Sequence, residues 1–443
     1  MAGSVGPPGV SRSFYRFLGI ISVLTCVAQQ GYAQIQGSAG QEGTKPFTAT
    51  VAIREGYDSN PLTQSYQSTQ DIDSSTYTSI QPSLGYNYIG LQADAALRYD
   101  FSGTYYPSIN QQYDIQYAQT FVGRYTYAID PRTSFTLANN FVYTEQPLVA
   151  QFVQAGISPT FNTSTINNLA TVQADYRVTD RLSMITRWNN TLVYLGGSSS
   201  NGNYMNNGAF QQFRLDFTPE TVGTFSFDYQ LFDYDNDNAF RDNQQVSFSL
   251  GADHTFLPEL FFSGRVGIQL NDNFGLTDNS SVISAGGMGS GEQEIGATPF
   301  ASISSTWNYE QNSFVSAGFS MQVQQSNLNT TADSEAYTLN LNWDHQFTEK
   351  FSVIQSFFVN LAVFTPELSQ GQTQNLFPGA TYQGSGQQTT VTYQCKFAYQ
   401  FFPYLSAEFG WSYTSYGSYF DLNNGNGNSY TRNQVYLGVR GTY

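Results

Sequence analysis

The last ten residues, 434–443 (QVYLGVRGTY), have the pattern of a membrane-facing β-strand. Side chains in a strand alternate between two faces. An apolar face and a more polar face therefore alternate here: Val435, Leu437, Val439, Gly441 and Tyr443 on the first, and Gln434, Tyr436, Gly438, Arg440 and Thr442 on the second. The same alternation recurs many times upstream with aromatic residues at the segment ends, which is typical of a transmembrane β-barrel. We therefore predict that this segment closes an antiparallel, up-and-down barrel.

A terminal strand of this kind with a final aromatic residue resembles the C-terminal signature of bacterial outer-membrane proteins. In those proteins the barrel-assembly machinery recognises the signature. The resemblance assigns that role here to Val435, Leu437, Val439 and Tyr443. It also implies a location in the outer membrane of a Gram-negative-type bacterium, in contact with lipid and lipopolysaccharide.

The composition agrees with a barrel and argues against other classes of protein. Of 443 residues, 16% are aromatic and only 11% are charged, whereas roughly a quarter are charged in an average soluble domain. The 33 acidic residues outnumber the 17 basic ones, a balance that disfavours nucleic acid as a partner. With only two cysteines, Cys26 and Cys395, neither a disulfide framework nor a cysteine metal cluster is expected, and no cofactor is predicted.

The N-terminus has the features of a secretory signal peptide. Arg12 and Arg16 precede an apolar run over 17–28, and Gly31, Tyr32 and Ala33 supply a small-residue exit. We predict a signal peptide over 1–33 for export through the Sec pathway, a periplasmic lead-in over 34–46, and a barrel over 47–443.

Tight-turn residues divide the rest of the chain into strand pairs. Asp, Pro, Asn and Gly favour such turns. We place turns at 88–90, 130–132, 179–181, 218–220, 257–259, 309–311, 348–350 and 402–404. About eight turns imply about eighteen strands, or sixteen if one pair is merged, with both termini on the periplasmic side.

Longer polar connections alternate with the tight turns and are expected on the outside of the cell. They are predicted at 57–75, 145–165, 196–208, 274–294, 365–387 and 419–428. The connection over 145–165 differs because it carries an apolar set: Leu148, Val149, Phe152, Val153, Ile157 and Phe161. Exposed apolar clusters usually bind something. This connection is therefore expected to fold into the lumen or to pack at a subunit interface, and a homo-oligomer is left open.

A second resemblance concerns residues 56–61 (GYDSNP). Tyr57, Asp58 and Asn60 resemble a Tyr-Asp-x-Asn element that follows the first strand in a family of β-barrel porins from Gram-negative bacteria, some of which are linked to exopolysaccharide export. The resemblance implies a porin-like barrel over nearly all of the mature chain. From the residues themselves, Asp58 and Asn60 are expected to form an Asx-type turn where the strand ends.

Catalytic and metal-binding alternatives find little support. An esterase or protease needs a base that reaches its substrate, and the only histidines, His254 and His345, are predicted to face outward. The acidic stretch over 233–238 lacks glycine at its sixth position, which excludes an EF-hand. A loose divalent site shared with lipopolysaccharide stays open there.

Charged residues within the strands are predicted to point inward, because an Arg or Lys facing lipid at midplane costs about 2 to 4 kcal/mol. The basic set is Arg98, Arg124, Arg177, Arg187, Arg214, Arg265, Lys396 and Arg440. The acidic set is Asp94, Asp100, Asp114, Asp175, Asp216, Asp228, Asp253, Asp344 and Glu408. These charges either line a pore or neutralise one another within the wall.

Taken together, the sequence predicts a non-enzymatic, porin-like channel for passive diffusion of small hydrophilic solutes. A mild preference for cations is expected if the surplus acid lines the mouth. The alternative is a structural or surface-binding barrel whose loops occlude the lumen and which serves exopolysaccharide export or adhesion.

Overall fold

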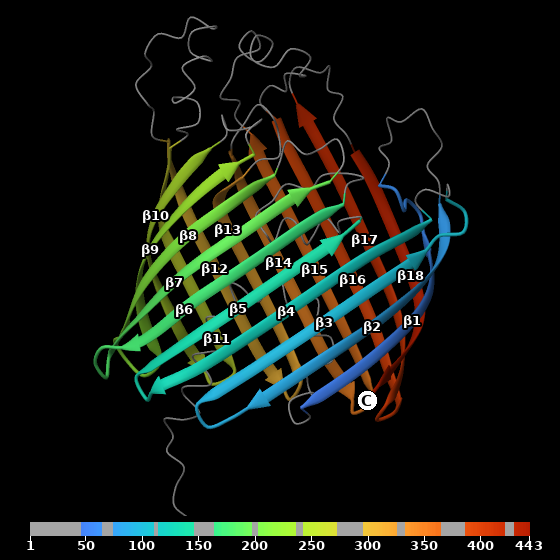
Figure 1. Cartoon of the computed structure of the whole chain (residues 1–443), viewed down its shortest axis with the longest axis horizontal. Coiled ribbons are helices and arrows are strands. Elements are labelled where there is room, and N and C mark those ends of the chain that lie inside the picture. Colours follow the sequence, from blue (N-terminus) through green and yellow to red (C-terminus); the bar gives the residue numbers. More distant parts are fainter. Residues whose placement is uncertain are drawn as a thin grey trace, which may run out of the picture. The chain divides into compact units, whose positions relative to one another are not determined.

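The chain forms a closed antiparallel barrel, seen in a computed structural model that describes residues 46–63, 74–109, 114–145, 164–196, 203–235, 242–272, 296–325, 333–364, 386–420 and 429–443. Figure 1 shows the tilted strands around the barrel. The sheet has 18 strands. In chain order they are β1 (Phe47–Asp58), β2 (Ser75–Ile89), β3 (Ala93–Tyr105), β4 (Ile115–Asp130), β5 (Thr133–Thr144), β6 (Thr165–Arg177), β7 (Leu182–Leu195), β8 (Tyr204–Asp216), β9 (Thr221–Tyr234), β10 (Asn243–Leu257), β11 (Leu260–Asp272), β12 (Gly296–Glu310), β13 (Ser313–Gln325), β14 (Asp333–Thr348), β15 (Phe351–Phe364), β16 (Gly386–Phe402), β17 (Leu405–Phe420) and β18 (Ser429–Thr442).

Every strand pairs with its neighbours in the sequence, and the pairing of β1 with β18 closes the ring. Ile53 lies opposite Val439, and Asp58 lies opposite Gln434. Below this register, Tyr443 N donates to the Ala49 carbonyl over 2.8 Å, and Ala49 N donates to the Tyr443 carbonyl over 3.2 Å. The predicted closing strand is therefore confirmed, and no strand of the ring is left with an open edge, the arrangement a membrane requires.

All of the predicted tight turns fall at strand junctions on the rim where the C-terminus lies (Figure 1). The predicted turn at 309–311 is displaced slightly, because β12 ends at Glu310 and Asn312 has a φ of 61°. Asn tolerates this left-handed conformation better than most residues. The strand count of eighteen is confirmed.

The connections on the opposite rim differ from prediction in two respects. The connection predicted over 196–208 is shorter, because β8 begins at Tyr204, whose ring packs against Phe232 and Tyr234. Further connections join β3 to β4, β9 to β10 and β13 to β14, and the turn signals did not separate these strands. The apolar connection over 145–165 lies mostly outside the described residues, as do residues 1–45 with the predicted signal peptide.

No helix within the described ranges is long and apolar enough to cross a membrane.

Candidate functional site: the charged inner face

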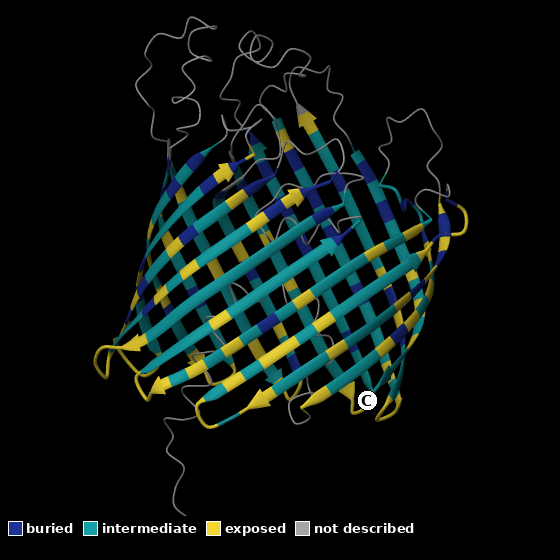
Figure 2. Ribbon diagram, viewed as in Figure 1, coloured by how far each residue is buried: buried dark blue, intermediate teal, exposed yellow. Residues whose placement is uncertain are grey.

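The barrel wall has two chemically different faces. Large apolar side chains are exposed at alternate positions, for example Ile53, Tyr125 and Leu437, and the exposed positions form a broken pattern along the strands (Figure 2). Ion pairs at the intervening positions join strands that are not neighbours, such as β1 with β17 and β8 with β10. The paired charges are nearly buried, whereas the apolar side chains that alternate with them are exposed, and the concave face of a closed barrel is the more enclosed one. The charged positions are therefore on the inner face and the apolar ones on the outer face.

The first group of inner charges lies at the closure of the barrel, and we call it the seam cluster: Arg54, Lys396, Glu408 and Arg440. Glu408 is its centre, with a side chain only 3% exposed. Its Oε2 lies 2.8 Å from Arg54 Nη2, and its Oε1 lies 2.7 Å from Arg440 Nε. Lys396, on β16, also interacts electrostatically with this carboxylate. Three cations thus surround one anion.

Glycine residues make room for this arrangement. Gly438 on β18 lies opposite both Arg54 and Glu408 in the strand register. A Cβ at this position would lie 2.7 Å from Arg54 Cγ and 2.9 Å from the Ile53 carbonyl oxygen. The bare backbone therefore lets Arg54 pass over β18 to a strand it does not pair with. The Arg54 guanidinium also lies 4.6 Å from the ring centroid of Tyr436, within cation–π range.

A second group uses the same design in the middle of the chain, and we call it the wall cluster: Arg214, Asp253 and Arg265. Asp253 accepts a 2.7 Å hydrogen bond from Ser263 Oγ. It lies 3.3 Å from Arg214 Nη2 and 3.5 Å from Arg265 Nη2. Gly251 provides the gap here, because a Cβ would lie 2.6 Å from Arg265 Cγ. Two cations again share one carboxylate.

The other predicted pore-lining residues lie on the inner face but do not join these clusters in one site. Arg98 pairs with Asp100 on its own strand at 2.9 Å. Arg187 lies 4.4 Å from the ring centroid of Phe210, while Asp228 accepts a 3.3 Å bond from Gln230 Nε2. Their partners are thus local, on the same strand or on the neighbouring one.

Three more predicted residues lie in less enclosed surroundings. Arg124 Nε donates to Thr126 Oγ1 over 3.4 Å. Arg177 Nη2 donates to the Asp180 carbonyl over 2.8 Å at a tight turn. Asp94 is exposed close to the turn that joins β2 and β3.

At the opposite end of the seam, Asp58 forms a second buried ion pair that the sequence did not predict. Its side chain is fully buried, and its Oδ2 lies 2.6 Å from Arg432 Nη2. Tyr106 OH and Gln434 Nε2 also donate to Asp58 Oδ2, over 3.2 and 2.8 Å. Asn60 N donates to Asp58 Oδ1 over 3.0 Å, which is the expected Asx-type turn. Asp58 therefore forms the turn at the end of β1 and also joins β1 to β18 through its ion pair with Arg432.

Arg54 and Arg432 were absent from the predicted inner-face set, although the sequence could have placed both there. Arg54 shares its strand face with Ala52 and Asp58, so strand phase alone assigns it to the inner face. Arg432 continues the inward series of Gln434 and Arg440. The alternation of side chains along a strand does not identify the partner of each charge, because the partner depends on how β1 is aligned with β18 and β17.

Both histidines occupy the outer face, as their phase predicted. His254 Nδ1 lies 2.9 Å from Thr221 Oγ1, and His345 Nδ1 lies 2.8 Å from Tyr309 OH. His345 also stacks on Trp343 with ring centroids 5.7 Å apart. These rings contact outer-face aromatic residues and not the inner charges.

The acidic stretch over 233–238 is described only to residue 235. Asp235 Oδ2 accepts a 2.8 Å bond from Asn203 Nδ2, an interaction that fixes the end of β9. Among the described residues, no three His, Cys, Asp or Glu side chains group in a way that could hold a metal ion.

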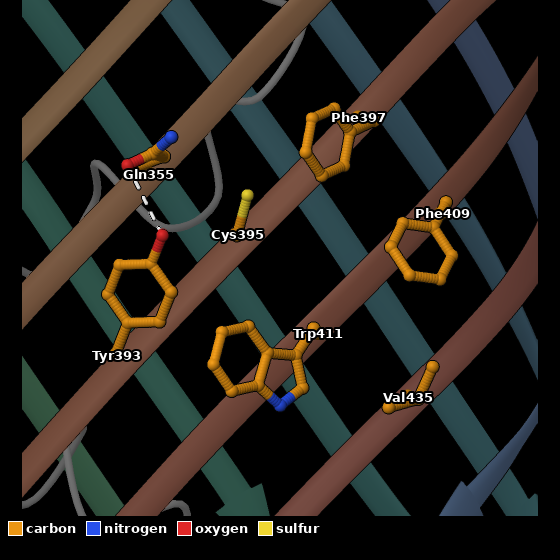
Figure 3. Close-up of a pocket in the computed structure, with 7 residues that line it drawn as sticks. All are labelled: Gln355, Tyr393, Cys395, Phe397, Phe409, Trp411 and Val435. Atoms are coloured by element: carbon orange, nitrogen blue, oxygen red, sulfur yellow. Dashed lines mark hydrogen bonds between the residues drawn. The ribbon is translucent and has the colours of Figure 1, made fainter.

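The outer face of β15–β18 is densely aromatic, with one shallow hollow of about 500 Å³. Cys395, which is 7% exposed, and the rings of Tyr393, Phe409 and Trp411 line it (Figure 3). A small residue among large rings produces the depression. Its lining is mostly apolar and faces away from the charged interior, so it is compatible with a lipid chain.

The predicted assembly-signal residues have the expected exposure. Val435, Leu437 and Val439 are 37%, 67% and 52% exposed on the outer face, and Tyr443 is 82% exposed. Their recognition by the assembly machinery remains a prediction from resemblance.

Comparisons with known proteins identify no family. No protein-family model matches the chain, and no curated protein matches it. Solved structures that match include OccK1 (OpdK) from Pseudomonas aeruginosa, at 8% identity and a TM-score of 0.43, covering 90% of this chain and 99% of that one. The siderophore receptor PirA from Pseudomonas aeruginosa matches at 8% identity and a TM-score of 0.39, covering 91% of this chain and 81% of that one.

The FrpB iron transporter from Neisseria meningitidis matches at 9% identity and a TM-score of 0.40, covering 91% of this chain and 82% of that one. At these scores the likeness adds nothing to the argument. The assignment rests on the molecule itself: a closed ring of antiparallel strands with an apolar outer face is a β-barrel of the outer-membrane type.

Proposed function

We propose that this barrel is a porin-like channel through which small hydrophilic solutes diffuse passively across the outer membrane. One observation carries the proposal: the ion pairs of the wall lie on its inner face, while large apolar side chains occupy its outer face. Charged side chains on the inner wall favour a wet interior. Barrels of 16 to 18 strands are wide enough to leave an aqueous channel.

The two charge clusters bear on which solutes pass. The seam cluster holds three cations, Arg54, Lys396 and Arg440, against Glu408 and the Asp344 carboxylate that also acts on Lys396. In the wall cluster, Asp175 and Asp216 also act on Arg214, so Arg214 and Arg265 are not in excess there. Rings of charge tune the selectivity of a pore. We therefore expect the cations of the seam cluster to favour small anions, in contrast to the mild cation preference expected if loop acids lined the mouth.

The test is single-channel conductance of the refolded barrel in planar bilayers, with the reversal potential measured under a salt gradient. We expect stepwise conductance and anion selectivity. Neutralising two cations with Arg54→Gln and Arg440→Gln should shift the reversal potential toward cation selectivity, and Glu408→Gln should shift it the other way. Arg181→Gln, at an exposed turn, is the control and should shift it much less.

A barrel that is folded and inserted but electrically silent would reject the open channel. It would favour a loop-occluded barrel that serves surface binding or exopolysaccharide export. One observation supports this second candidate: Tyr106 and Ile109, which follow β3, pack with Leu62 against Tyr77 on the inner face. Chain segments thus turn inward at this rim.

A further inference from the structure

The outer face of β5–β8 departs from the apolar pattern of the wall. Here Asn139 Nδ2 donates to Asn168 Oδ1 over 3.0 Å, and Asn190 Nδ2 donates to Asn207 Oδ1 over 2.9 Å. Thr186 Oγ1 donates to Gln211 Oε1 over 2.7 Å. We call these six residues the amide stripe. They lie on the outer face because they alternate with inner-face positions and share their face with exposed side chains such as Leu137, Trp188 and Phe213.

The strand register makes the stripe continuous. Asn139 lies opposite Ala170, Ala170 opposite Asn190, and Asn190 opposite Asn207, so one row crosses four strands. Thr186 and Gln211 lie directly opposite one another two rows away. Trp188, which is 45% exposed, and Ala209 occupy the row between them. The stripe is therefore a patch of paired polar groups around one protruding ring.

Three other amide side chains on the outer face have a different hydrogen-bond partner. Gln119, Gln244 and Gln355 each accept a hydrogen bond from a tyrosine hydroxyl, of Tyr99, Tyr229 and Tyr393, at 3.3, 3.3 and 3.2 Å. A phenol ring thus accompanies each of these single amides. The stripe has small residues instead, namely Ala170, Ala174 and Ala209, beside its amides.

Amide groups are unfavourable against hydrocarbon unless their hydrogen-bonding capacity is satisfied. An amide has two N–H groups and a carbonyl oxygen with two lone pairs, so one bond between two amides uses only part of that capacity. The further bond that Asn139 Nδ2 donates to the Leu169 carbonyl, over 3.5 Å, still leaves acceptor sites in that pair. Small residues and side-chain amides together mark the surfaces where membrane proteins contact one another. The stripe therefore has the chemistry of a protein contact and not of a lipid contact.

We propose that the amide stripe is the surface by which this barrel binds a second copy of itself. An uncharged amide is both donor and acceptor, so the stripe is complementary to its own copy. Barrels in one membrane are inserted in the same orientation, and a rotation axis along the membrane normal brings identical faces together. Each copy then contributes a protruding Trp188 ring, and the alanines leave space for the Trp188 ring of the other copy.

Cysteine cross-linking in the outer membrane tests this arrangement. The chain used carries Cys26→Ser and Cys395→Ser, so that an introduced thiol is unique. Ala209→Cys lies within the stripe, and Val266→Cys, on the outer face of β11 and 64% exposed, is the matched control. We expect a disulfide-linked dimer of this chain for Ala209→Cys on mild oxidation and at most a trace for Val266→Cys.

Equal yields at the two positions would overturn the proposal, as would no product at 209 when a lipid-soluble maleimide labels both thiols. An adduct of a different mass at 209 would show that another protein covers the stripe, and would also overturn it.

A second variant separates a protein contact from a lipid contact. Asn190→Leu with Asn207→Leu removes one amide pair, and intramembrane hydrogen bonds of this kind are worth enough to weaken association by roughly tenfold. We expect the cross-link at 209 to fall accordingly, while the heat-modifiable barrel band persists. A monomer of raised stability with an unchanged cross-link would mean that the amides face lipid, and would reject the proposal.

Discussion

The seam cluster and the wall cluster have the same chemistry but different positions in the chain. Each places a nearly buried carboxylate between arginines, with a glycine in the gap. Arg54 and Glu408 are 354 residues apart, whereas Arg265 and Asp253 are only 12 apart. The wall cluster can form once strands β8 to β11 have paired, and the Glu408–Arg440 pair needs only β17 and β18. The contact between Arg54 and Glu408 requires the closed ring. Similar contacts therefore have different consequences for closure.

The largest expected effect is that of Glu408→Gln. It leaves Arg54, Lys396 and Arg440 without their shared anion, and breaking a buried ion pair in this way lowers the free energy of unfolding by about 3 to 5 kcal/mol. Asp253→Asn is the matched variant, and we expect a similar loss of stability. The two should differ in refolding into vesicles, followed by tryptophan fluorescence. Glu408→Gln should close slowly, and equal refolding rates would show that the seam is not the late step.

An intermediate effect is expected when the glycine gaps are filled. Gly438→Val places a side chain against Arg54 and the Ile53 carbonyl, and overpacking of this kind costs about 1 to 3 kcal/mol. Gly251→Val is the counterpart in the wall cluster. Urea unfolding measures both. Adding Arg54→Ala should recover part of the loss in Gly438→Val and none of the loss in Gly251→Val; recovery in both would contradict the proposed contact.

The smallest effect is expected for Arg98→Gln. Its pair with Asp100 lies within one strand, with side chains 32% and 25% exposed. Exposed ion pairs contribute about 0 to 1 kcal/mol. The midpoint of urea unfolding should hardly move, and a loss as large as that of Glu408→Gln would show that burial does not distinguish these pairs.

Much of the fold was predictable from the sequence because a barrel is built from local signals. Period-two alternation assigned Arg214, Asp253 and Glu408 to the inner face, and the turn residues located the hairpins. The terminal strand was predicted correctly because its apolar face is uninterrupted. Each of these signals lies within one strand or one turn and needs no knowledge of register.

The candidate site was less predictable, because two of its ion pairs, Arg54 with Glu408 and Arg214 with Asp253, join strands that do not pair. Nothing in the sequence near Arg54 indicates that Glu408 is its partner, since the contact depends on closure and on the gap at Gly438. The amide stripe was missed for a different reason. Asn139 and Asn168 interrupt the apolar series of β5 and β6, so they weaken the strand signal instead of standing out as a site.

The hydrogen bonds between Ala49 and Tyr443 place the two ends of the barrel side by side. The ring would keep its topology if these ends were joined by a short linker and the chain were opened at the turn between Pro131 and Arg132. The terminal strand now has two features: it pairs with β1 to close the ring, and it ends in an aromatic residue. In such a circular permutant these two features belong to different strands. The sheet itself does not determine which strand is first or last, and insertion of the permutant would test whether the position of the aromatic terminus matters.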